Sequence, residues 1–432
     1  MRAAFYTLGC KVNQYETSAL EQQFAARGFT IVDTAENADV YVLNSCTVTA
    51  QGDKKSRQLL RRFRRQNPGA VVVLCGCFPQ AFPREAEAIP EADIVVGSTG
   101  RSRLAGLVEQ RLKTRGERAE RLVSILPHHK GEIFEPLRVE GYSARTRAFV
   151  KIQDGCERYC AYCIIPTARG PVRSKPLEDL RPELQGLAEA GYREVVLVGI
   201  NLSSYGTDLG LRLLDAVRLA CSVPGIHRVR LGSLEPELLT PEDIGQLARL
   251  PKLCPQFHLS LQSGCDETLK RMRRHYDAAL YRRIVRDLRG AFPGCAITTD
   301  IMVGFPGETG GEFAQSLDFA REIGFARAHV FAYSKRPGTL AAKLEGQIEE
   351  PVKASRSKEM IAATDTARRA FLQSQAGTQA EVLLETKLPD GRWEGHTPNY
   401  TPVRVEAPDG QSGRILPVRI TGAEQDWCVG GG

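Results

Sequence analysis

Three cysteines are closely spaced in the segment KIQDGCERYCAYCIIPTARG, directly after a run of residues typical of a β-strand. Cys156, Cys160 and Cys163 form a C-x3-C-x2-C pattern. Three thiolates at this spacing can bind three irons of a cubane and leave the fourth iron without a protein ligand. The main alternative is zinc, but structural zinc sites need four ligands, commonly in two paired halves, and no second half lies nearby. The pattern therefore predicts a [4Fe-4S] cluster in a loop that follows a strand.

Short β-branched runs alternate with helical stretches from residue 144 to 376, which is typical of an α/β fold with parallel strands. We expect strands at 148–153, 194–199, 227–231, 256–261, 296–303 and 328–333. A helix at 351–375 closes this domain. Six consecutive units predict a partial (β/α)6 barrel, in which the loops at the carboxyl ends of the strands form the site.

The rest of the 432-residue chain divides into further domains, because single cores rarely grow beyond roughly 250 to 300 residues. Residues 1–112 show a second α/β alternation, which predicts a doubly wound domain. Its expected strands are 3–8, 40–44, 71–74 and 93–96, and its helices begin near Tyr15, Gln51, Gln80 and Arg101. Residues 113–143 are polar, contain prolines and look like a linker. Residues 377–432 carry short strands separated by turn residues, which predicts a small all-β barrel.

The twelve cysteines also favour metal or catalytic roles. No apolar run approaches the roughly 20 residues that span a bilayer, and the start MRAAFYTLGCKVNQ has no long apolar region. We therefore expect a cytoplasmic protein without a membrane partner, in a compartment where disulfides are rare. Cys10, Cys46 and Cys77 each follow a predicted parallel strand, and such strand ends converge on one crevice. A second metal site there competes with the simpler interpretation as buried free cysteines.

The cysteine loop resembles the signature of the radical S-adenosylmethionine (SAM) superfamily, with the aromatic Tyr162 directly before the last cysteine. The resemblance implies that SAM binds the open iron and is cleaved to a 5′-deoxyadenosyl radical, and that Tyr162 lies against the adenine. Core packing is the alternative role for Tyr162. Further SAM contacts in this superfamily come from strand ends, each a weak signal alone, and the matching positions here are Gly199, Asn201, Ser260, Gln262, Ser263, Gly304, Phe331 and Tyr333.

The segments LGCKVNQYE, NSCTVT and GCFPQ closely resemble the cluster-binding segments of the methylthiotransferases, a radical SAM family with an extra amino-terminal cluster domain. The order of domains also matches, ending in a TRAM domain, a small β-barrel associated with RNA binding. The resemblance implies that Cys10, Cys46 and Cys77 hold a second [4Fe-4S] cluster, and it selects Cys77 over the competing Cys75. The other cysteines are interpreted as packing or surface thiols: Cys221, Cys254, Cys265, Cys295 and Cys428.

The family resemblance implies a two-stage use of SAM. One SAM methylates a sulfur on the amino-terminal cluster, and a second yields the radical that removes a hydrogen from the substrate. The spellings LGCKVNQYE, GINLSSYG and TTDIMVGFPGE look most like the branch that converts N6-threonylcarbamoyladenosine of tRNA, next to the anticodon, to its 2-methylthio form. The alternatives are isopentenyladenosine in tRNA, an aspartate of a ribosomal protein, and a non-catalytic iron–sulfur protein that binds RNA. The expected partners are tRNA and an electron donor protein, but no DNA.

The net charge of +7 permits a polyanionic partner. A predicted helix at 51–67 has one acid, Asp53, and seven basic residues: Lys54, Lys55, Arg57, Arg61, Arg62, Arg64 and Arg65. These form either a solvated helix face or a surface for RNA phosphates. Arg169 and Arg173 are further candidates, for phosphate or for the carboxylate of a threonylcarbamoyl group, with plain solvation as the alternative. The segment 377–432 has five basic and eight acidic residues, so RNA binding is expected to depend on the helix and on these arginines.

Overall fold

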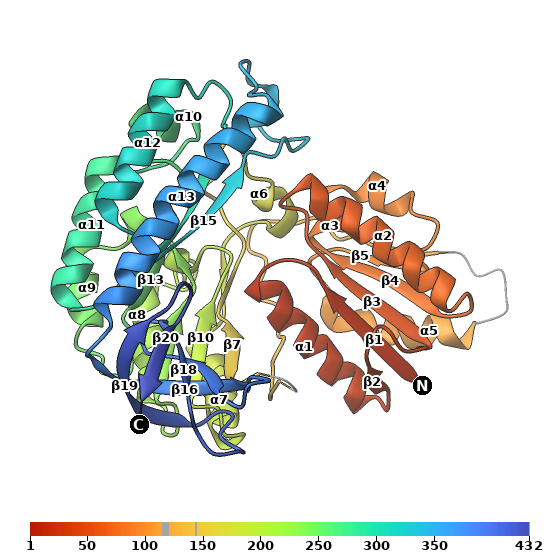
Figure 1. Ribbon diagram of the computed structural model, residues 1–432. Helices are drawn as coiled ribbons and strands as arrows, with labels where there is room; N and C mark the ends of the chain where they lie inside the picture. The colour runs from red at the N-terminus through yellow and green to blue at the C-terminus, as the bar shows by residue number, and fades with distance from the viewer. Residues whose placement is uncertain (115–120, 143–144, 432) are drawn as a thin grey trace.

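The computed structural model describes residues 1–114, 121–142 and 145–431. An amino-terminal α/β lobe lies beside a larger central lobe, and the carboxyl-terminal strands lie against the lower part of the central lobe in the view of Figure 1. Short parts of the predicted linker, at 115–120 and 143, and the last residue of the predicted small barrel lie outside the described residues. No helix of the described part of the chain is both long and apolar enough to cross a membrane.

The amino-terminal lobe contains a parallel six-stranded sheet in the order β2-β1-β3-β4-β5-β6. Its strands are β1 (Arg2–Thr7), β2 (Thr30–Val32), β3 (Val40–Ser45), β4 (Val71–Gly76), β5 (Ile94–Val96) and β6 (Leu122–Ser124). Its helices are α1 (Lys11–Ala26), α2 (Ala50–Gln66), α3 (Cys77–Ala81), α4 (Pro83–Glu87) and α5 (Leu104–Lys113), with a short 3-10 turn η1 (Arg101–Arg103). The predicted doubly wound α/β arrangement is confirmed.

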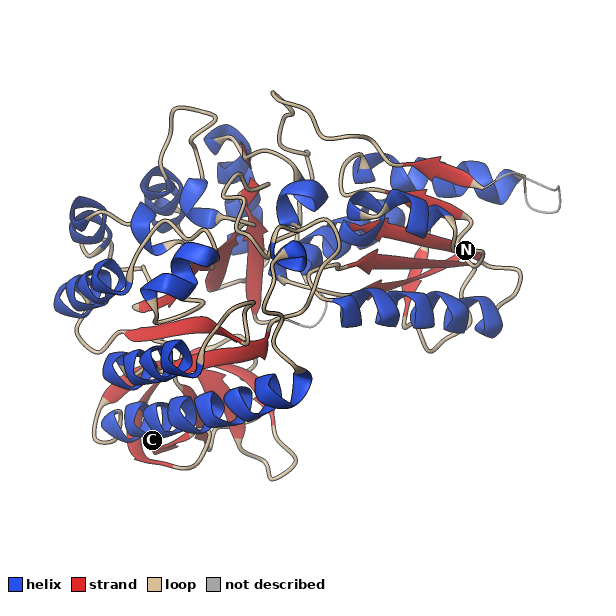
Figure 2. Cartoon of the chain, turned by 90° about the horizontal axis from the view of Figure 1, so that it is seen from above, coloured by secondary structure: helices blue, strands red, loops and turns tan. Residues whose placement is uncertain are grey.

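Both faces of this sheet are covered by helices, as Figure 2 shows. Successive strand residues point to opposite faces, and β3 is buried throughout its length, as expected for a parallel sheet that is covered on both sides. Tyr41 packs with Leu60 and Phe63 of α2 on one face. Val40 packs with Phe24 of α1 on the other.

The segment that we predicted to be a linker, 113–143, differs from the prediction in two places. Leu122–Ser124 forms β6 and extends the sheet beyond β5 in parallel register. Further along, Leu137 and Val139 are buried between the lobes. A strand of three residues at a sheet edge carries too little periodicity to be recognised in the sequence, so only the fold shows that this segment adds to the sheet.

The central lobe is an open barrel of parallel strands. Two sheets, β11-β10-β7 and β12-β13-β14-β15, are joined by a bridge between Val229 and Leu253. The strands are β7 (Arg147–Lys151), β10 (Glu194–Val198), β11 (Arg228–Leu231), β12 (Ser233–Leu234), β13 (Gln256–Leu259), β14 (Ala296–Val303) and β15 (Arg327–Ala332). The predicted partial barrel is confirmed, with β12 as a short addition. A small antiparallel pair, β8 (Gln153–Asp154) and β9 (Arg173–Ser174), lies beyond β7.

Helices surround the outside of this barrel, and their apolar sides form one continuous core with the strands. Thr309 and Glu312 cap each other's backbone N–H groups at the start of α12, which stabilises that end. The helices are α6 (Ile165–Arg169), α7 (Leu177–Glu189), α8 (Leu213–Ser222), α9 (Pro241–Leu247), α10 (Asp266–Arg271), α11 (Ala278–Ala291), α12 (Gly310–Ile323) and α13 (Glu350–Ser374). The 3-10 turns are η2 (Leu202–Ser204), η3 (Pro236–Leu238) and η4 (Ala341–Lys343).

The carboxyl-terminal strands form a closed barrel in the order β16-β17-β18-β20-β19. They are β16 (Gln379–Lys387), β17 (Trp393–His396), β18 (Pro402–Val405), β19 (Ile415–Ala423) and β20 (Cys428–Gly431). The predicted small β-barrel is therefore confirmed. Trp393 and Val382 belong to its core, which Leu372 of α13 joins.

Candidate functional site

Cys156, Cys160 and Cys163 lie in a loop after β8, beyond the carboxyl end of β7. The loop is tightly folded, because Tyr159 has a φ of 50° and the Cys163 N–H donates to the Cys160 carbonyl. Hydrogen-bond donors surround the sulfurs. The Arg274 Nη1 lies 3.2 Å from the Cys160 Sγ, and the Ile165 N–H lies 3.4 Å from the Cys163 Sγ. Donors directed at sulfur stabilise a thiolate that binds iron.

Burial raises the pKa of Cys156 to about 11 and that of Cys163 to about 12. A bound metal would supply positive charge that stabilises these thiolates. Among the described residues, no three His, Cys, Asp or Glu side chains could hold a single metal ion together. This spacing suits a cubane, because its thiolates bind different irons.

Cys10, Cys46 and Cys77 follow three neighbouring strands of the amino-terminal sheet, β1, β3 and β4. Their loops are close to one another, because a Cβ added at Gly9 would lie 2.8 Å from the Cys46 Cβ and 3.2 Å from its Sγ. Gly9 also has a φ of 115°, so this position requires glycine. Burial, and to a smaller extent the charge of the neighbouring Cys77, raise the pKa of Cys46 to about 12. The parallel strands therefore bring three distant cysteines to one edge of the sheet.

Cys75 and Cys77 have different surroundings. Cys75 is fully buried inside β4 among the apolar side chains that face α1 and α5. Cys77 begins α3, and its Sγ accepts a hydrogen bond of 3.1 Å from the Nε of Arg169 in the central lobe. The side chain of Cys75 thus belongs to the core, whereas that of Cys77 faces the other lobe.

A buried group of charges joins the two lobes around Glu16 of α1. Glu16 accepts hydrogen bonds from Arg101, from Lys151 at 2.7 Å and from Arg169 at 3.0 Å. Asp154 contacts Lys151 and Arg169. Burial alone would raise the pKa of Glu16, but Arg101, Arg169 and Lys151 hold it well below its usual value. The same kind of balance keeps the pKa of Asp154 low. The relative position of the lobes therefore depends on a charge network that the sequence analysis did not identify.

The prediction that Arg169 and Arg173 contact RNA phosphate is not supported by their surroundings. Arg169 is 0% exposed and Arg173 is 3% exposed. Arg173 lies 2.9 Å from Glu132 and 3.5 Å from Asp154. Both guanidinium groups are therefore bound to carboxylates inside the protein. Isolated sequence positions cannot distinguish such arginines from surface ones.

The positions expected to contact SAM lie at the carboxyl ends of the barrel strands, around the Cys156 loop. Asn201 follows β10, and its Nδ2 is 3.9 Å from the Cys156 Sγ. Tyr162 packs edge to face on Phe305, next to Tyr333. Three of the expected residues have buried side-chain oxygens without a hydrogen-bond partner among the described residues: Asn201, Gln262 and Tyr333. Unpaired buried oxygens usually await a ligand or water, so this region fits a polar ligand such as SAM.

The other residues expected to contact SAM differ from one another in burial and surroundings. Ser260 and Ser263 are buried after β13, and Phe331 is 38% exposed near the end of β15. Gly199 follows β10 and lines a cavity. Gly304 has a φ of 70°, and a Cβ there would lie 2.4 Å from the Cγ of Lys353 in α13. The glycine at this strand end therefore accommodates a helix of the same domain.

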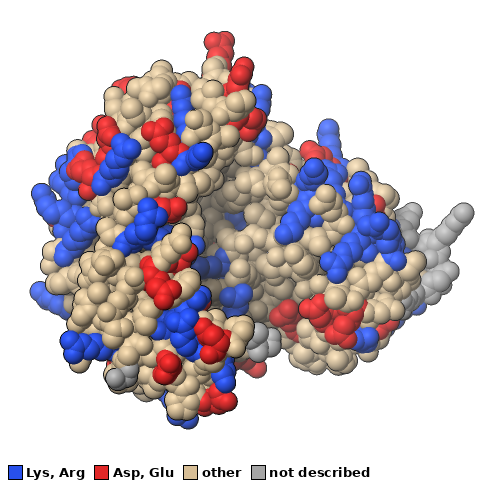
Figure 3. Space-filling model, viewed as in Figure 1, with Lys and Arg blue, Asp and Glu red and all other residues tan. Residues whose placement is uncertain are grey.

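A cavity of about 520 Å³ lies inside the barrel and opens toward the amino-terminal lobe. Figure 3 shows the hollow between the two lobes, with basic side chains at its base. Cys10 and Lys11 form one side, the strands from β7 to β15 form the wall, and Tyr400 of the small barrel contributes to the lining. Val12 and Tyr15 of α1 pack with Phe149 of β7 beside it. The cavity thus borders all three domains.

Polar residues at alternate positions of the barrel strands line this cavity. The His258 Nε2 lies 3.3 Å from Asp300, and its Nδ1 lies 3.1 Å from Thr298. Burial alone would raise the pKa of Asp300, but the hydrogen bond from His258 and nearby cations lower it. Burial and the charge of Arg327 lower the pKa of His329. The sequence analysis missed this cavity, although polar residues recurring with a period of two inside parallel strands could have indicated it.

The basic helix predicted at 51–67 is present as α2, and Thr49 caps its first turn. Figure 3 shows basic side chains gathered on this lobe. The arginines of α2 differ in their contacts. Arg64 is bound to Asp93 and to the backbone around it, and Arg57 pairs with Glu85. Asp53 pairs with Arg336 of the central lobe. The exposed basic residues are Lys54, Lys55, Arg61, Arg62 and Arg65.

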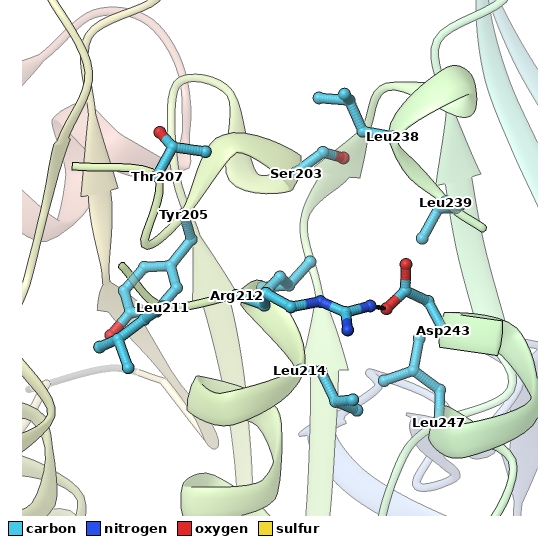
Figure 4. A pocket seen from close by; sticks show the side chains of 11 residues that line it. Ser203, Tyr205, Thr207, Leu211, Arg212, Leu214, Leu238, Leu239, Asp243 and Leu247 are labelled. Atoms are coloured by element: carbon cyan, nitrogen blue, oxygen red, sulfur yellow. Dashed lines mark hydrogen bonds and ion pairs between the residues drawn. The ribbon is translucent and has the colours of Figure 1, made fainter. Parts of the chain in front are cut away.

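A smaller pocket of about 140 Å³ lies near the start of α8 and α9 (Figure 4). Arg212 and Asp243 form an ion pair across it. Leu214 and Leu247 contribute apolar surface. It contains no cysteine and none of the residues expected to contact SAM or RNA.

An open parallel barrel with a three-thiol loop after its first strand, and with unpaired polar groups around that loop, defines a radical SAM enzyme. Consistent with this, residues 150–320 match the family described as the radical SAM superfamily, and residues 2–97 match uncharacterized protein family UPF0004. In fold, the chain resembles the radical SAM methyltransferase TsrM from Kitasatospora setae, which binds cobalamin and a [4Fe-4S] cluster, with a TM-score of 0.57 and 15% identity over 79% of this chain and 73% of that chain.

Similar proteins indicate to which family of radical SAM enzymes this chain belongs. The chain is 40% identical to the threonylcarbamoyladenosine tRNA methylthiotransferase MtaB of Bacillus subtilis, over 96% of this chain and 93% of the relative. It is 35% identical to MtaB of Thermotoga maritima, over 98% and 95%. It is also 35% identical to a tRNA-2-methylthio-N(6)-dimethylallyladenosine synthase of Akkermansia muciniphila, over 96% and 95%. The chain therefore belongs to the methylthiotransferase family of radical SAM enzymes, and its cofactors are SAM and [4Fe-4S] clusters.

Proposed function

We propose that this protein adds a methylthio group to C2 of N6-threonylcarbamoyladenosine next to the anticodon of tRNA. One structural observation carries the proposal: Cys10 and the loop after β10, which contacts Cys156, border the same cavity. A substrate in that cavity can approach both thiol groups in one binding event. Similarity over nearly the whole chain to two MtaB methylthiotransferases supports this choice of substrate.

We assign the two thiol groups to two [4Fe-4S] clusters. Cys156, Cys160 and Cys163 hold the cluster that binds SAM, and the second is held by Cys10, Cys46 and Cys77. When bound, these groups supply the radical chemistry that breaks an unactivated C–H bond and the sulfur that replaces the hydrogen. The chain's own residues position them. Arg274 and Arg169 donate hydrogen bonds to cysteine sulfurs of the two sites, so each site has one charged donor.

The polar oxygens that lack partners orient SAM in this proposal. Asn201, Gln262 and Tyr333 lie at three different strand ends, and their side chains can hydrogen-bond the amino, carboxylate or ribose groups of the cofactor. Tyr162 and the strand-end residues Gly199, Ser260, Ser263, Gly304 and Phe331 complete the predicted set. Preorganised contacts of this kind keep the reacting carbon of SAM directed at the substrate.

The tRNA binds across the amino-terminal lobe and the cavity mouth. The exposed cations Lys54, Lys55, Arg62 and Arg65 of α2 offer a surface for phosphates. Three other basic residues of this helix already have carboxylate partners: Arg57, Arg61 and Arg64. A separate protein delivers the electron, and the enzyme works in the cytoplasm. Both of these remain predictions from the sequence and the reaction.

Dimethylallyladenosine of tRNA is the second candidate substrate, because a synthase that forms its methylthio derivative is 35% identical to this chain over nearly its full length. Mass analysis of tRNA nucleosides from cells that lack the protein separates the two. We expect the 2-methylthio-threonylcarbamoyladenosine peak to disappear. Expression of the unchanged chain or of Cys221→Ala should restore the peak, whereas Cys160→Ala should not. Persistence of the peak in the deletion strain would refute the proposed substrate.

A further inference from the structure

The cavity between the amino-terminal lobe and the barrel carries more positive than negative side chains. Its lining includes one carboxylate, Asp300, and several basic groups: Lys11, Arg147, Arg230, His258, Arg327 and His329. Asp300 is already paired with His258. A cavity with surplus cations suits an anionic ligand.

Two of the arginines are committed to structural contacts. The Nε of Arg230 lies 2.8 Å from Glu194, and the Nη2 of Arg147 lies 3.1 Å from Glu385. Their guanidinium carbons lie 4.7 and 4.8 Å from the ring centre of Tyr400. These cations therefore hold the small barrel against the cavity, and their charges have partners inside the protein.

Lys11 and Arg327 have no such partners. Within the described ranges, neither side chain forms a hydrogen bond or an ion pair with another residue. Both nevertheless lie close enough to the other charges to act on them, since Lys11 contributes to the low pKa of Asp300 and Arg327 to that of His329. They come from different lobes, one from the start of α1 and one from β15. Two unpaired cations thus border one cavity.

We propose that this cavity binds the carboxylate of the threonylcarbamoyl group, with Lys11 and Arg327 as the binding cations. The inference rests on the proposed function and names the subsite that selects its substrate. Lys11 directly follows Cys10, so a carboxylate at Lys11 keeps the modified base beside the amino-terminal thiols. A dimethylallyl group has no charge to offer these cations, and placing it there would desolvate them without compensation. The same cavity therefore favours one tRNA substrate over the other.

The carboxyl-terminal barrel contributes to this pocket through Tyr400. This residue has a φ of 67°, a left-handed conformation that is costly for a tyrosine. Its ring is stacked on His396 and lies against both arginines. In this proposal the small barrel closes the substrate pocket, which gives it a role that does not require a basic surface.

The test compares two tRNA substrates with the reconstituted holoenzyme. One carries threonylcarbamoyladenosine, and the other carries the same nucleoside with its carboxylate converted to a neutral amide. We expect the unchanged enzyme to have a kcat/KM about 10- to 100-fold lower for the amide, the effect of losing a charge-assisted hydrogen bond. Lys11→Gln and Arg327→Gln should lower kcat/KM for the acid by a similar factor and remove its preference over the amide. Arg283→Gln, an exposed arginine of α11, is the matched control and should keep that preference.

A binding measurement separates this inference from the proposed function. Equilibrium dialysis of the holoenzyme with the free nucleosides should show tighter binding of the acid than of the amide, and Lys11→Gln and Arg327→Gln should abolish the difference. Equal binding of the two nucleosides by the unchanged enzyme would overturn the pocket assignment, even if tRNA is methylthiolated. A preference in binding without any methylthiolation of the tRNA would support the pocket and refute the proposed function. Loss of SAM cleavage in the absence of tRNA upon Lys11→Gln would also overturn the assignment, because the lysine would then serve the cofactor.

Discussion

Replacing Glu16 with glutamine should separate the two lobes more than any surface change of the same kind. Glu16 is 0% exposed and accepts hydrogen bonds from Arg101, Lys151 and Arg169. Glutamine has nearly the same shape but no charge, so the three buried cations would keep Asp154 and, beside Arg101, Glu135 as nearby counter-charges. Removing one partner of a buried ion pair costs about 3 to 5 kcal/mol, because an uncompensated charge remains.

Hydrogen exchange of backbone amides measures this cost locally, which suits a chain with several domains. A loss of about 3 to 5 kcal/mol corresponds to exchange that is about 100- to 5,000-fold faster for amides of α1 and β7 that open with the interface. Glu109→Gln is the control in the same lobe, because Glu109 pairs with Arg27 at the surface, where both side chains are more than a third exposed. Its effect should stay below about 5-fold.

A double variant tests the charge argument. Arg101→Met added to Glu16→Gln removes one of the three cations that contact Glu16, so it should recover part of the lost protection. Equal exchange rates in Glu16→Gln and Glu109→Gln would refute the reasoning. A double variant that is less protected than Glu16→Gln alone would show that packing, and not charge balance, decides the stability of this interface.

Three further predictions follow from other parts of the structure. Gly9→Ala should lower the iron bound by the amino-terminal thiols and leave the electron paramagnetic resonance signal of the Cys156 site unchanged, whereas Gly28→Ala, which has a similar φ but no close neighbour, should retain all iron. Charge reversal at Lys54, Lys55, Arg62 and Arg65 should reduce the salt slope of tRNA binding by about 3 to 4, and an unchanged slope would exclude this surface. Because Glu16 and Asp154 have lowered pKa values in the folded state, the unfolded state binds more protons as the pH falls, so the free energy of unfolding should fall below about pH 4, and more steeply than in Glu16→Gln.

The cysteine spacing determined the chemistry because the three residues of the central site are local in sequence. A loop that contains Cys156, Cys160 and Cys163 keeps its thiols together in any fold that places it after a strand. The strand and helix periodicities were also local, so the order of the three domains could be predicted. The short strands β2 and β6 at the edges of the amino-terminal sheet could not, since three residues are too few to show a period.

The amino-terminal thiol site could be predicted from the sequence only in part. The sequence predicted that Cys10, Cys46 and Cys77 each follow a strand. Only the strand order β1-β3-β4 of the folded sheet brings those strand ends side by side. Sequence resemblance favoured Cys77 over Cys75. In the structure, Cys75 packs inside the sheet, and Cys77 is the cysteine that Arg169 reaches.

Only the tertiary structure decided the roles of the charged residues. The sequence analysis interpreted Arg169 and Arg173 as candidates for contact with a ligand or solvent. Both are instead buried in the network around Glu16 and Asp154. Lys11 and Arg327 were not among the predicted site residues, yet they line the cavity and, within the part of the chain that the structure describes, have no hydrogen-bond or ion-pair partner. The reason is physical: a charge acts through whatever lies within a few ångströms of it, and those neighbours are more than 130 residues away in sequence for pairs such as Glu16 with Lys151. Sequence alone therefore determined the cofactor chemistry, and the packing of the lobes determined which charges stabilise the fold and which remain free to bind a substrate.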